Sequence, residues 1–324
     1  METNELAILI SRLFDEALTH IPDQDDEVFC LRVRELEFFV ASDSTGRLLA
    51  ILPSADDEIN LASTRFSFAS RKRITWRDRP ADRQEFAVLY LTETSALEID
   101  QFVEVIVSLC QCLQSGMAGN QLARIIESWF GLLISGDEPT YSAVLGLWGE
   151  LFIISMARDI RAVIGAWQWR DTEPLDFLYR GSAVEVKCTT GSFREHSTSL
   201  TQSLAAANLR TAVASVMTQD EIEGTSIYEI YNSLLVSVGD DPVLAAKLVS
   251  AFARRVGFSR RIHDWTFSLD KARESLVFAS WDKLPSADFG DGITSARWSF
   301  VLHESCTCKK DQLSSIDLAL SEIF

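Results

Sequence analysis

The stretch that decides the fold is Pro174-Leu175-Asp176-Phe177-Leu178-Tyr179-Arg180-Gly181-Ser182-Ala183-Val184-Glu185-Val186-Lys187. Two strand-like runs flank Arg180-Gly181, whose glycine suits a two-residue hairpin turn. This loop predicts a register in which Asp176 lies directly across from Glu185. Because side chains alternate along a strand, Glu185 and Lys187 share one face of the hairpin. The other predicted pairs are Phe177 with Val184, Leu178 with Ala183, and Tyr179 with Ser182.

Two opposed carboxylates suggest a metal centre. Their Cβ atoms would be roughly 4.5–5.5 Å apart, which is unfavourable unless something cationic lies between them. Mg²⁺ takes oxygen ligands from one or two carboxylates and completes its shell with water and substrate phosphate. Lys187 would neutralise developing charge or orient the attacking water, so the chemistry is metal-assisted phosphodiester hydrolysis. The alternative is a surface hairpin in which Asp176, Glu185 and Lys187 form an ordinary salt-bridge set.

The neighbouring sequence favours a site over a surface hairpin. The reverse face of the second strand is apolar, so its charged face borders a cleft. Glu150 is the single acid of the very apolar run 142–157, where a charge is costly unless it is paired or bound to metal. His196, Ser199 and Gln202 follow the hairpin and could complete the site. In the alternative, His196 caps a turn, Gln202 bonds to backbone, and Glu150 is a capped core acid.

Hydrophobic periodicity and turn residues predict the remaining elements. Helices are expected over residues 1–20, over 97–135 with a break at Gly116 and Gly119, and over 142–157, 200–207, 226–238 and 241–257. A small antiparallel sheet is expected within residues 28–91. Further strands are expected over 162–169, 174–180, 182–190 and 209–218, with a second β-rich patch at 264–269, 274–281 and 296–303.

These elements predict a mixed α/β (α+β) chain in four regions. Residues 1–97 form an N-terminal helix with a β-rich region, and residues 98–137 form a helical connector. Residues 138–220 form the core that carries the hairpin, and residues 221–324 form a C-terminal helical and β-rich extension. Within 138–218 the expected order is helix, strand, strand, strand, helix, strand.

Composition limits the possible partners. The 324 residues include 47% hydrophobic ones, but no apolar run reaches the roughly 20 residues of a membrane helix. The N-terminus lacks a secretory signal, so a cytoplasmic location is expected, and six sparse cysteines are expected to be free thiols. A net charge of −17 argues against unaided DNA binding. The short basic stretches lie at residues 71–79, Arg254-Arg255, Arg260-Arg261 and Lys309-Lys310.

Three blocks of the sequence resemble the PD-(D/E)xK nuclease superfamily, and more closely the bacterial family of "PD-(D/E)XK motif proteins". Gly146-Leu147-Trp148-Gly149-Glu150-Leu151 is similar to its GLxGEL helix. Asp176-Phe177 with Glu185-Val186-Lys187 resembles its DF…EVK hairpin. His196, Ser199 and Gln202 match its HxxSxxQ segment.

The resemblance implies a restriction-endonuclease-like αβββαβ core. Glu150 would come from the first helix, Asp176 from the second strand, and Glu185 with Lys187 from the third. Asp176, Glu185 and Glu150 would hold Mg²⁺, for which Mn²⁺ can substitute. Lys187 and Gln202 would complete the catalytic set, with His196 and Ser199 supporting it or contacting DNA. Family members occur with ATPase or helicase-like and methyltransferase partners in restriction-like and phage-defence gene sets.

The leading hypothesis is a Mg²⁺-dependent DNA endonuclease that serves as one subunit of a prokaryotic defence complex, with partners that supply DNA affinity. A homo-oligomer is also compatible with the sequence. The first alternative is a non-catalytic assembly subunit that keeps the nuclease fold. The second is an RNA or nucleotide hydrolase that uses the same centre.

Overall fold

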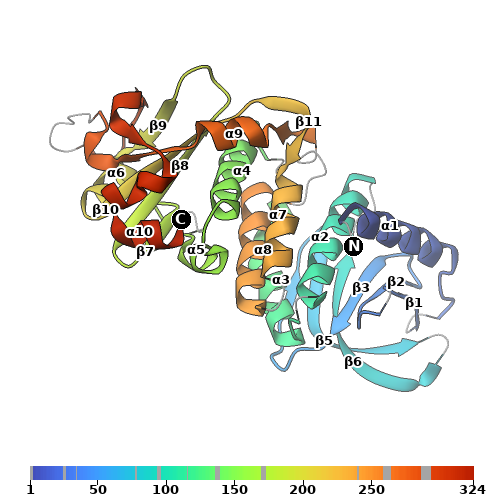
Figure 1. Ribbon diagram of the computed structural model, residues 1–324. Helices are drawn as coiled ribbons and strands as arrows, with labels where there is room; N and C mark the ends of the chain where they lie inside the picture. Colours follow the sequence, from blue (N-terminus) through green and yellow to red (C-terminus); the bar gives the residue numbers. More distant parts are fainter. Residues whose placement is uncertain are drawn as a thin grey trace. The chain divides into compact units, whose positions relative to one another are not determined.

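The structure is a computed structural model that describes residues 3–24, 27–33, 35–76, 79–92, 96–114, 116–135, 139–168, 173–238, 241–257, 264–285 and 293–324. The chain divides into two compact units (Figure 1). The first unit consists of residues 1–139 and 238–260, and the second of residues 140–237 and 261–324. None of the described helices combines the length and apolarity that a membrane span requires.

The first unit contains a small closed sheet. Its strand order is β1-β2-β3-β6-β5-β4, and β1 also pairs in parallel with β5, so that five strands form a ring. The strands are β1 Glu27–Arg32, β2 Phe39–Asp43, β3 Leu48–Pro53, β4 Asn60–Ala62, β5 Phe66–Trp76 and β6 Arg79–Leu91. The helices are α1 Thr3–Thr19, α2 Ala96–Gln114, α3 Gly119–Ser135 and α8 Pro242–Val256.

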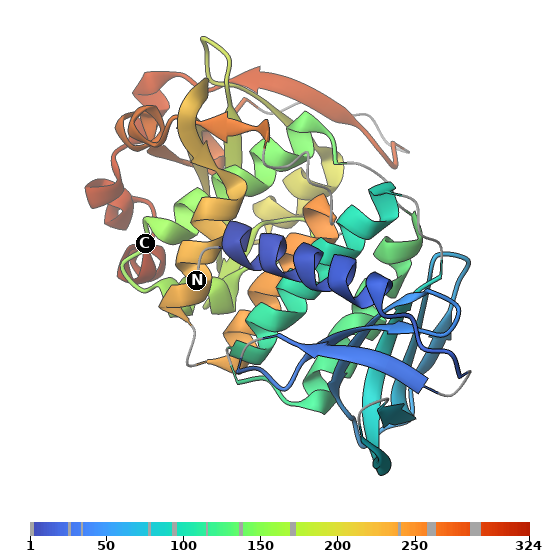
Figure 2. The same ribbon diagram turned by 90° about the vertical axis from the view of Figure 1, so that its right-hand side faces the viewer.

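Alternating side chains build the two sides of this sheet. Leu49 and Ile51 of β3 join one buried cluster with residues of the neighbouring strands, while Leu48, Ala50 and Leu52 are buried on the other face. Strands that are buried on both faces are continuous runs of apolar residues in the sequence. Helix α1 packs against α2 (Figure 2). Between these helices the rings of Phe14 and Phe102 stack with their centroids 5.5 Å apart.

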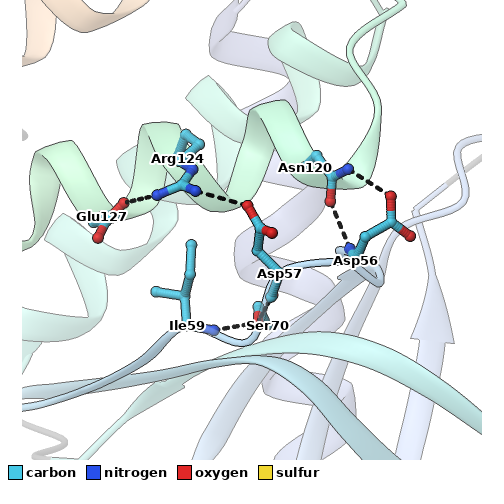
Figure 3. A network of polar contacts seen from close by, with 7 residues as sticks. All are labelled: Asp56, Asp57, Ile59, Ser70, Asn120, Arg124 and Glu127. Atoms are coloured by element: carbon cyan, nitrogen blue, oxygen red, sulfur yellow. Dashed lines mark hydrogen bonds and ion pairs between the residues drawn. The ribbon is translucent and has the colours of Figure 1, made fainter.

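Polar contacts fix α3 against the loop before β4 (Figure 3). Arg124 forms ion pairs with Asp57 at 2.6 Å and with Glu127 at 3.1 Å. One turn earlier on the helix, the Asn120 side chain accepts from Asp56 N at 2.5 Å and donates to Asp56 Oδ2 at 2.7 Å. These pairs are exposed, and exposed pairs contribute at most about 1 kcal/mol each. They set the position of the helix more than its stability.

The second unit is built on a five-stranded sheet in the order β15-β13-β10-β8-β7. Its strands are β7 Phe177–Tyr179, β8 Ser182–Thr189, β10 Arg210–Met217, β13 Val277–Ser280 and β15 Thr307–Cys308. Two small sheets pair β9 Glu195–Ser199 with β14 Arg297–Val301, and β11 Asp220–Ser226 with β12 Thr266–Phe267. The α-helices are α4 Tyr141–Ser155, α5 Ile160–Ala166, α6 Leu200–Ala207, α7 Ile227–Ser237, α9 Leu269–Ser275 and α10 Leu318–Ile323. Short 3₁₀ turns span Trp281–Lys283, Glu304–Cys306 and Lys310–Ser315.

Helices cover both faces of strand β8. Helix α4 packs so closely that a Cβ on Gly149 would lie 2.7 Å from Cys188 Cβ. On the opposite face of β8, Ala183 packs with Leu175 and with Ala206 of α6. Because residues 183, 185 and 187 share a face, Glu185 and Lys187 belong to the side covered by α6.

One predicted strand is wrong. Residues 162–166 of the run expected as a strand over 162–169 belong to helix α5, whose Asp159 cap accepts a hydrogen bond from Ala162 N at 2.9 Å. Trp167 ends this helix and makes only an isolated bridge to Phe177. As a result, Asp176 and Glu185 come from the neighbourhood of β7 and from β8, which are the first two strands after α4. Strand β9 follows them but pairs with β14 outside the main sheet.

Most other elements occur where the sequence places them. Helix α6 spans the expected residues 200–207. Helix α8 begins after its cap Asp241, has Pro242 in the first turn, and ends at Gly257, whose φ of 66° suits glycine. All six cysteines are thiols outside any disulfide, in agreement with the sequence prediction. The helices and sheets of the two units confirm the mixed α/β character.

Candidate active site

The hairpin has the predicted turn and register. Arg180 and Gly181 both have positive φ, at 49° and 82°, which is the conformation of a two-residue type I′ turn. Strands β7 and β8 pair in antiparallel fashion in the three predicted pairs, Phe177 with Val184, Leu178 with Ala183, and Tyr179 with Ser182. Asp176 immediately precedes the first of these pairs, so the same register continued by one residue places it opposite Glu185.

Asp176 holds the end of the short strand β7. Its Oδ2 accepts a hydrogen bond from Val186 N at 2.7 Å, and its backbone carbonyl accepts from Gln168 N at 2.7 Å. The carboxylate thus takes a backbone donor of β8 at the point where β7 begins. This contact fixes Asp176 beside Glu185.

Glu185 is buried, with 2% of its surface exposed, and its two carboxylate oxygens differ sharply. Oε1 accepts from Lys187 Nζ at 2.7 Å and from Gln202 Nε2 at 2.6 Å. Oε2 is buried and has no hydrogen-bond partner among the described residues. A buried acceptor without a donor is costly, so Oε2 is an available ligand position.

The electrostatics of Glu185 reflect a concentration of acids. Burial, together with the negative charge of Asp176, raises the pKa of Glu185 to about 8. Lys187 opposes this rise, while Glu150 contributes a smaller increase. Asp176 and Glu150 therefore both lie close enough to repel Glu185, and a cation among the acids would relieve that repulsion.

Glu150 comes from α4 and is 5% exposed. Its Oε2 accepts from Trp167 Nε1 at 2.7 Å. Trp167 is itself buried at the end of α5 and bridges to Phe177 of β7. A buried indole N–H normally has a partner, and here the partner is a site acid.

Gln202 links a helix cap to the carboxylate. Ser199 caps α6 by accepting from Gln202 N at 3.2 Å, and Gln202 Oε1 accepts from Ser199 N at 3.1 Å. Thr198 Oγ1 also donates to Gln202 Oε1 at 3.2 Å. With Oε1 held by these donors, the amide nitrogen points to Glu185. The cap and the site thus use one side chain.

His196 lies near Lys187, and its hydrogen-bond partner is Ser215. Its Nε2 lies 2.8 Å from Oγ of Ser215, the residue of β10 paired with Lys187, and its ring contacts Phe300. Burial, together with the charges of Lys187 and Arg194, lowers the pKa of His196 to about 4. His196 is therefore neutral at pH 7.

The three acids have the chemistry of ligands for a divalent cation, although they do not form a ready-made metal site. No group of three or more His, Cys, Asp or Glu side chains stands ready to hold a metal within the described part of the chain. The donor chemistry nevertheless fits, because Oε2 of Glu185 lacks a partner and the charges of Asp176 and Glu150 both raise the pKa of Glu185. Carboxylate oxygens are the ligands that Mg²⁺ prefers.

A family model described as "Putative PD-(D/E)XK family member, (DUF4420)" matches residues 19–303. The chain belongs to this family. Neither the curated proteins nor the solved structures gave a match. Membership in the PD-(D/E)XK family indicates a nuclease-type phosphodiesterase. The sequence of Asp176 with Glu185-Val186-Lys187 has the form of the motif after which that family is named.

Two contacts of this candidate site were missed by sequence reasoning. Trp167 was not among the candidate residues, yet its indole N–H donates to Glu150. Thr198 was not among them either, yet it helps to orient Gln202. The signal for Trp167 was its indole N–H, which needs an acceptor once it is buried.

The basic stretches differ in their surroundings. Arg71 pairs with Glu85 at 2.7 Å. By contrast, Arg158, Lys309 and Lys310 have no carboxylate partner in the described ranges and donate to backbone carbonyls instead, those of Ser321, Glu274 and Met156. With Arg273 they surround a cavity of about 470 Å³, which we call the basic hollow. Arg260-Arg261 lies outside the described residues.

Proposed function

We propose that this protein is a metal-dependent nuclease that hydrolyses phosphodiester bonds in DNA. The observation that carries the proposal is the asymmetry of Glu185: donors from Lys187 and Gln202 hold Oε1, while the buried Oε2 is left for a ligand. A salt-bridge hairpin at the surface has no need for a buried oxygen of this kind. Asp176 and Glu150, from two other segments, add the charge that attracts a cation.

The side chains have distinct roles in this proposal. Glu185, Asp176 and Glu150 would hold the cation, and Gln202 keeps the carboxylate of Glu185 in one orientation. Lys187 uses one of its ammonium hydrogens on Glu185. Its other two can donate to a phosphate oxygen or hold the attacking water. Neutral His196 supports β10 beside Lys187.

A bound Mg²⁺ or Mn²⁺ would polarise the phosphodiester and lower the pKa of a bound water. The residues around it exclude bulk solvent, since Glu185 and Glu150 are 2% and 5% exposed. Within such a dry site, the ammonium of Lys187 acts on developing negative charge more strongly than it would in water.

DNA binding would rely on local positive charge and on partners. A chain with a net charge of −17 repels phosphate overall. The basic hollow concentrates four cations with Asp311 as the single acid in its lining, and lies in the same unit as the site. We therefore propose that ATPase or helicase-like or methyltransferase subunits of a prokaryotic defence system supply most of the DNA affinity, and that the protein works in the cytoplasm.

The test is cleavage of plasmid DNA with Mg²⁺ or Mn²⁺, by the protein alone and with the products of its neighbouring genes. Asp176→Asn and Lys187→Ala should abolish cleavage. Glu322→Gln is the matched control, because this acid is half exposed and pairs with Arg180 at the turn. Equal cleavage by wild type and Asp176→Asn would refute the proposal.

A second candidate is a non-catalytic assembly subunit. The Lys187–Glu185 pair at 2.7 Å favours it, because an ammonium can stabilise a buried carboxylate without metal. The two candidates differ in metal binding. Calorimetric titration with Mn²⁺, with and without DNA, should give binding for the nuclease. The absence of binding near millimolar concentration would favour the scaffold.

A further inference from the structure

A second cavity, of about 390 Å³, lies beyond the end of β8. A volume of this size falls within the range of roughly 300–1,000 Å³ that pockets for small molecules have. Its polar lining consists of Thr189, Ser192, Glu195, His196, Ser197 and Ser299, and we call it the serine hollow.

The serine hollow continues the row of site residues along β8. Glu185, Lys187 and Thr189 share one face of the strand, and successive members of such a row are roughly 6.6 Å apart. His196, in the wall of the hollow, bonds to Ser215, which pairs with Lys187 across the sheet. A DNA strand with one phosphodiester at Lys187 would therefore place an adjacent nucleotide at the serine hollow.

The charge of the lining does not suit phosphate. Among the residues that the structure describes, no lysine or arginine lines the serine hollow, and Glu195 would repel an anion. Arg194, the cation of this loop, is directed elsewhere: it donates to Ser215 Oγ at 2.9 Å and to the backbone carbonyls of Ser215 and Ser275. Hydroxyls and a carboxylate instead suit an uncharged ring that carries both donors and acceptors. Nucleobases have this character, and a carboxylate can accept from an exocyclic amino group.

An exposed aromatic side chain stands at the same place. Phe193 is 71% exposed and also lines the hollow. Its loop is held at both ends, by Gly191 N donating to Thr189 Oγ1 at 3.1 Å and by Leu302 N donating to the Arg194 carbonyl at 2.9 Å. Stacking of a base on an aromatic ring adds to the affinity for a nucleic acid without any need for positive charge. An acidic protein can therefore use such a contact.

We propose that the serine hollow receives an unpaired nucleobase of the substrate strand, with Phe193 stacked on it. This inference rests on the proposed nuclease function and narrows its substrate to DNA that is single-stranded or locally opened. A base inside a regular duplex is paired and stacked, and it reaches such a hollow only after it has been extruded.

The test uses the full chain carrying Asp176→Asn, with binding measured by fluorescence anisotropy at low ionic strength without metal. One labelled strand carries bases, and a second of equal length is abasic. Phe193→Ala should weaken binding of the strand with bases by at least about five-fold, the effect of one lost stack, and leave the abasic strand unchanged. Phe193→Trp should restore the affinity. Ile222→Ala, at a residue that is 99% exposed, is the control.

Three outcomes would overturn the inference: equal binding by Phe193→Ala and its parent, an equal loss on both strands, or no binding of either strand. Failure of the proposed function gives a different result, since the wild-type protein with its partners would then show no metal-dependent cleavage. If metal-dependent cleavage is observed but Phe193→Ala binds both strands as its parent does, only the base site is rejected and the proposed nuclease function stands.

Discussion

Gln202 Nε2 donates to Glu185 Oε1 at 2.6 Å while the Oε1 atom of the same Gln202 amide accepts from Ser199 N. The two ends of one amide thus join the start of α6 to the buried carboxylate. Because each end is held by a different group, rotating the amide by half a turn would break both contacts. The helix cap therefore sets the orientation of the site acid.

Gln202→Glu should separate these two roles. The variant keeps an oxygen for the cap but replaces the donor to Glu185 with a like charge. We expect turnover to fall roughly 10- to 150-fold, the equivalent of a lost charge-assisted hydrogen bond of about 1.5–3 kcal/mol. Ser199→Ala should cost about 1 kcal/mol of stability and leave turnover within about three-fold. Parallel losses of turnover in the two variants would contradict this assignment.

Divalent cations should stabilise the protein through Glu185. At a concentration 100 times Kd, a ligand that binds only the folded state adds about 2.7 kcal/mol to the free energy of unfolding. Mg²⁺ or Mn²⁺ should therefore raise the Tm of the wild type and of Glu322→Gln in a thermal-shift measurement. Glu185→Gln and Asp176→Asn should lose most of the rise. An undiminished rise in Glu185→Gln would place the cation elsewhere.

His196 should contribute stability that is lost as the pH falls from 7 to 5. Its pKa is lowered to about 4 in the folded protein, below its ordinary value near 6.5. Between these values the unfolded chain binds the extra proton, so the contribution of His196 falls by about 2 kcal/mol between pH 7 and pH 5. Glu185, whose pKa is raised to about 8, changes the stability in the opposite direction over the same range. In urea unfolding, His196→Asn should therefore gain about 2 kcal/mol relative to the wild type between pH 7 and pH 5, and an unchanged difference between the two proteins would exclude this role of His196.

Two glycines of α4 should respond oppositely to alanine. A Cβ at Gly149 would lie 2.7 Å from Cys188 Cβ, whereas one at Gly146 would meet nothing within 4 Å. Gly149→Ala should lower the free energy of unfolding by about 1–3 kcal/mol through overpacking, and it should displace Glu150. Gly146→Ala should raise the free energy of unfolding by roughly 0.5–1 kcal/mol. Chemical denaturation compares them directly. Cys188→Gly should partly rescue Gly149→Ala, and failure to do so would point to another clash.

Local rules were enough to predict the hairpin. The dipeptide Arg180-Gly181 implied a two-residue turn, and such a turn fixes the register of both strands. Helix α6 was likewise predicted over residues 200–207, and in the structure it begins at a capping box that joins Ser199 to Gln202. In each case the determining contacts join residues that are neighbours in sequence.

The prediction of a strand over residues 162–169 failed for the opposite reason. Short apolar runs with branched residues fit a strand or a buried helix equally well. Asp159, just before the predicted span, was the available signal, because it caps α5. Non-local pairings gave no signal at all: neither the closure of β1 onto β5 nor the pairing of β9 with β14 follows from periodicity.

The pairing of β9 with β14 also has a consequence for the order of assembly. The β7–β8 hairpin needs only a two-residue loop, and hairpins form within about 1–10 μs. Strand β14 begins at Arg297, so during synthesis the wall with Ser299 emerges long after both carboxylates of the hairpin. A nascent chain thus acquires its acidic centre first and its serine hollow last. Ribosome-bound fragments that end before β14 offer a way to observe the centre before the hollow exists.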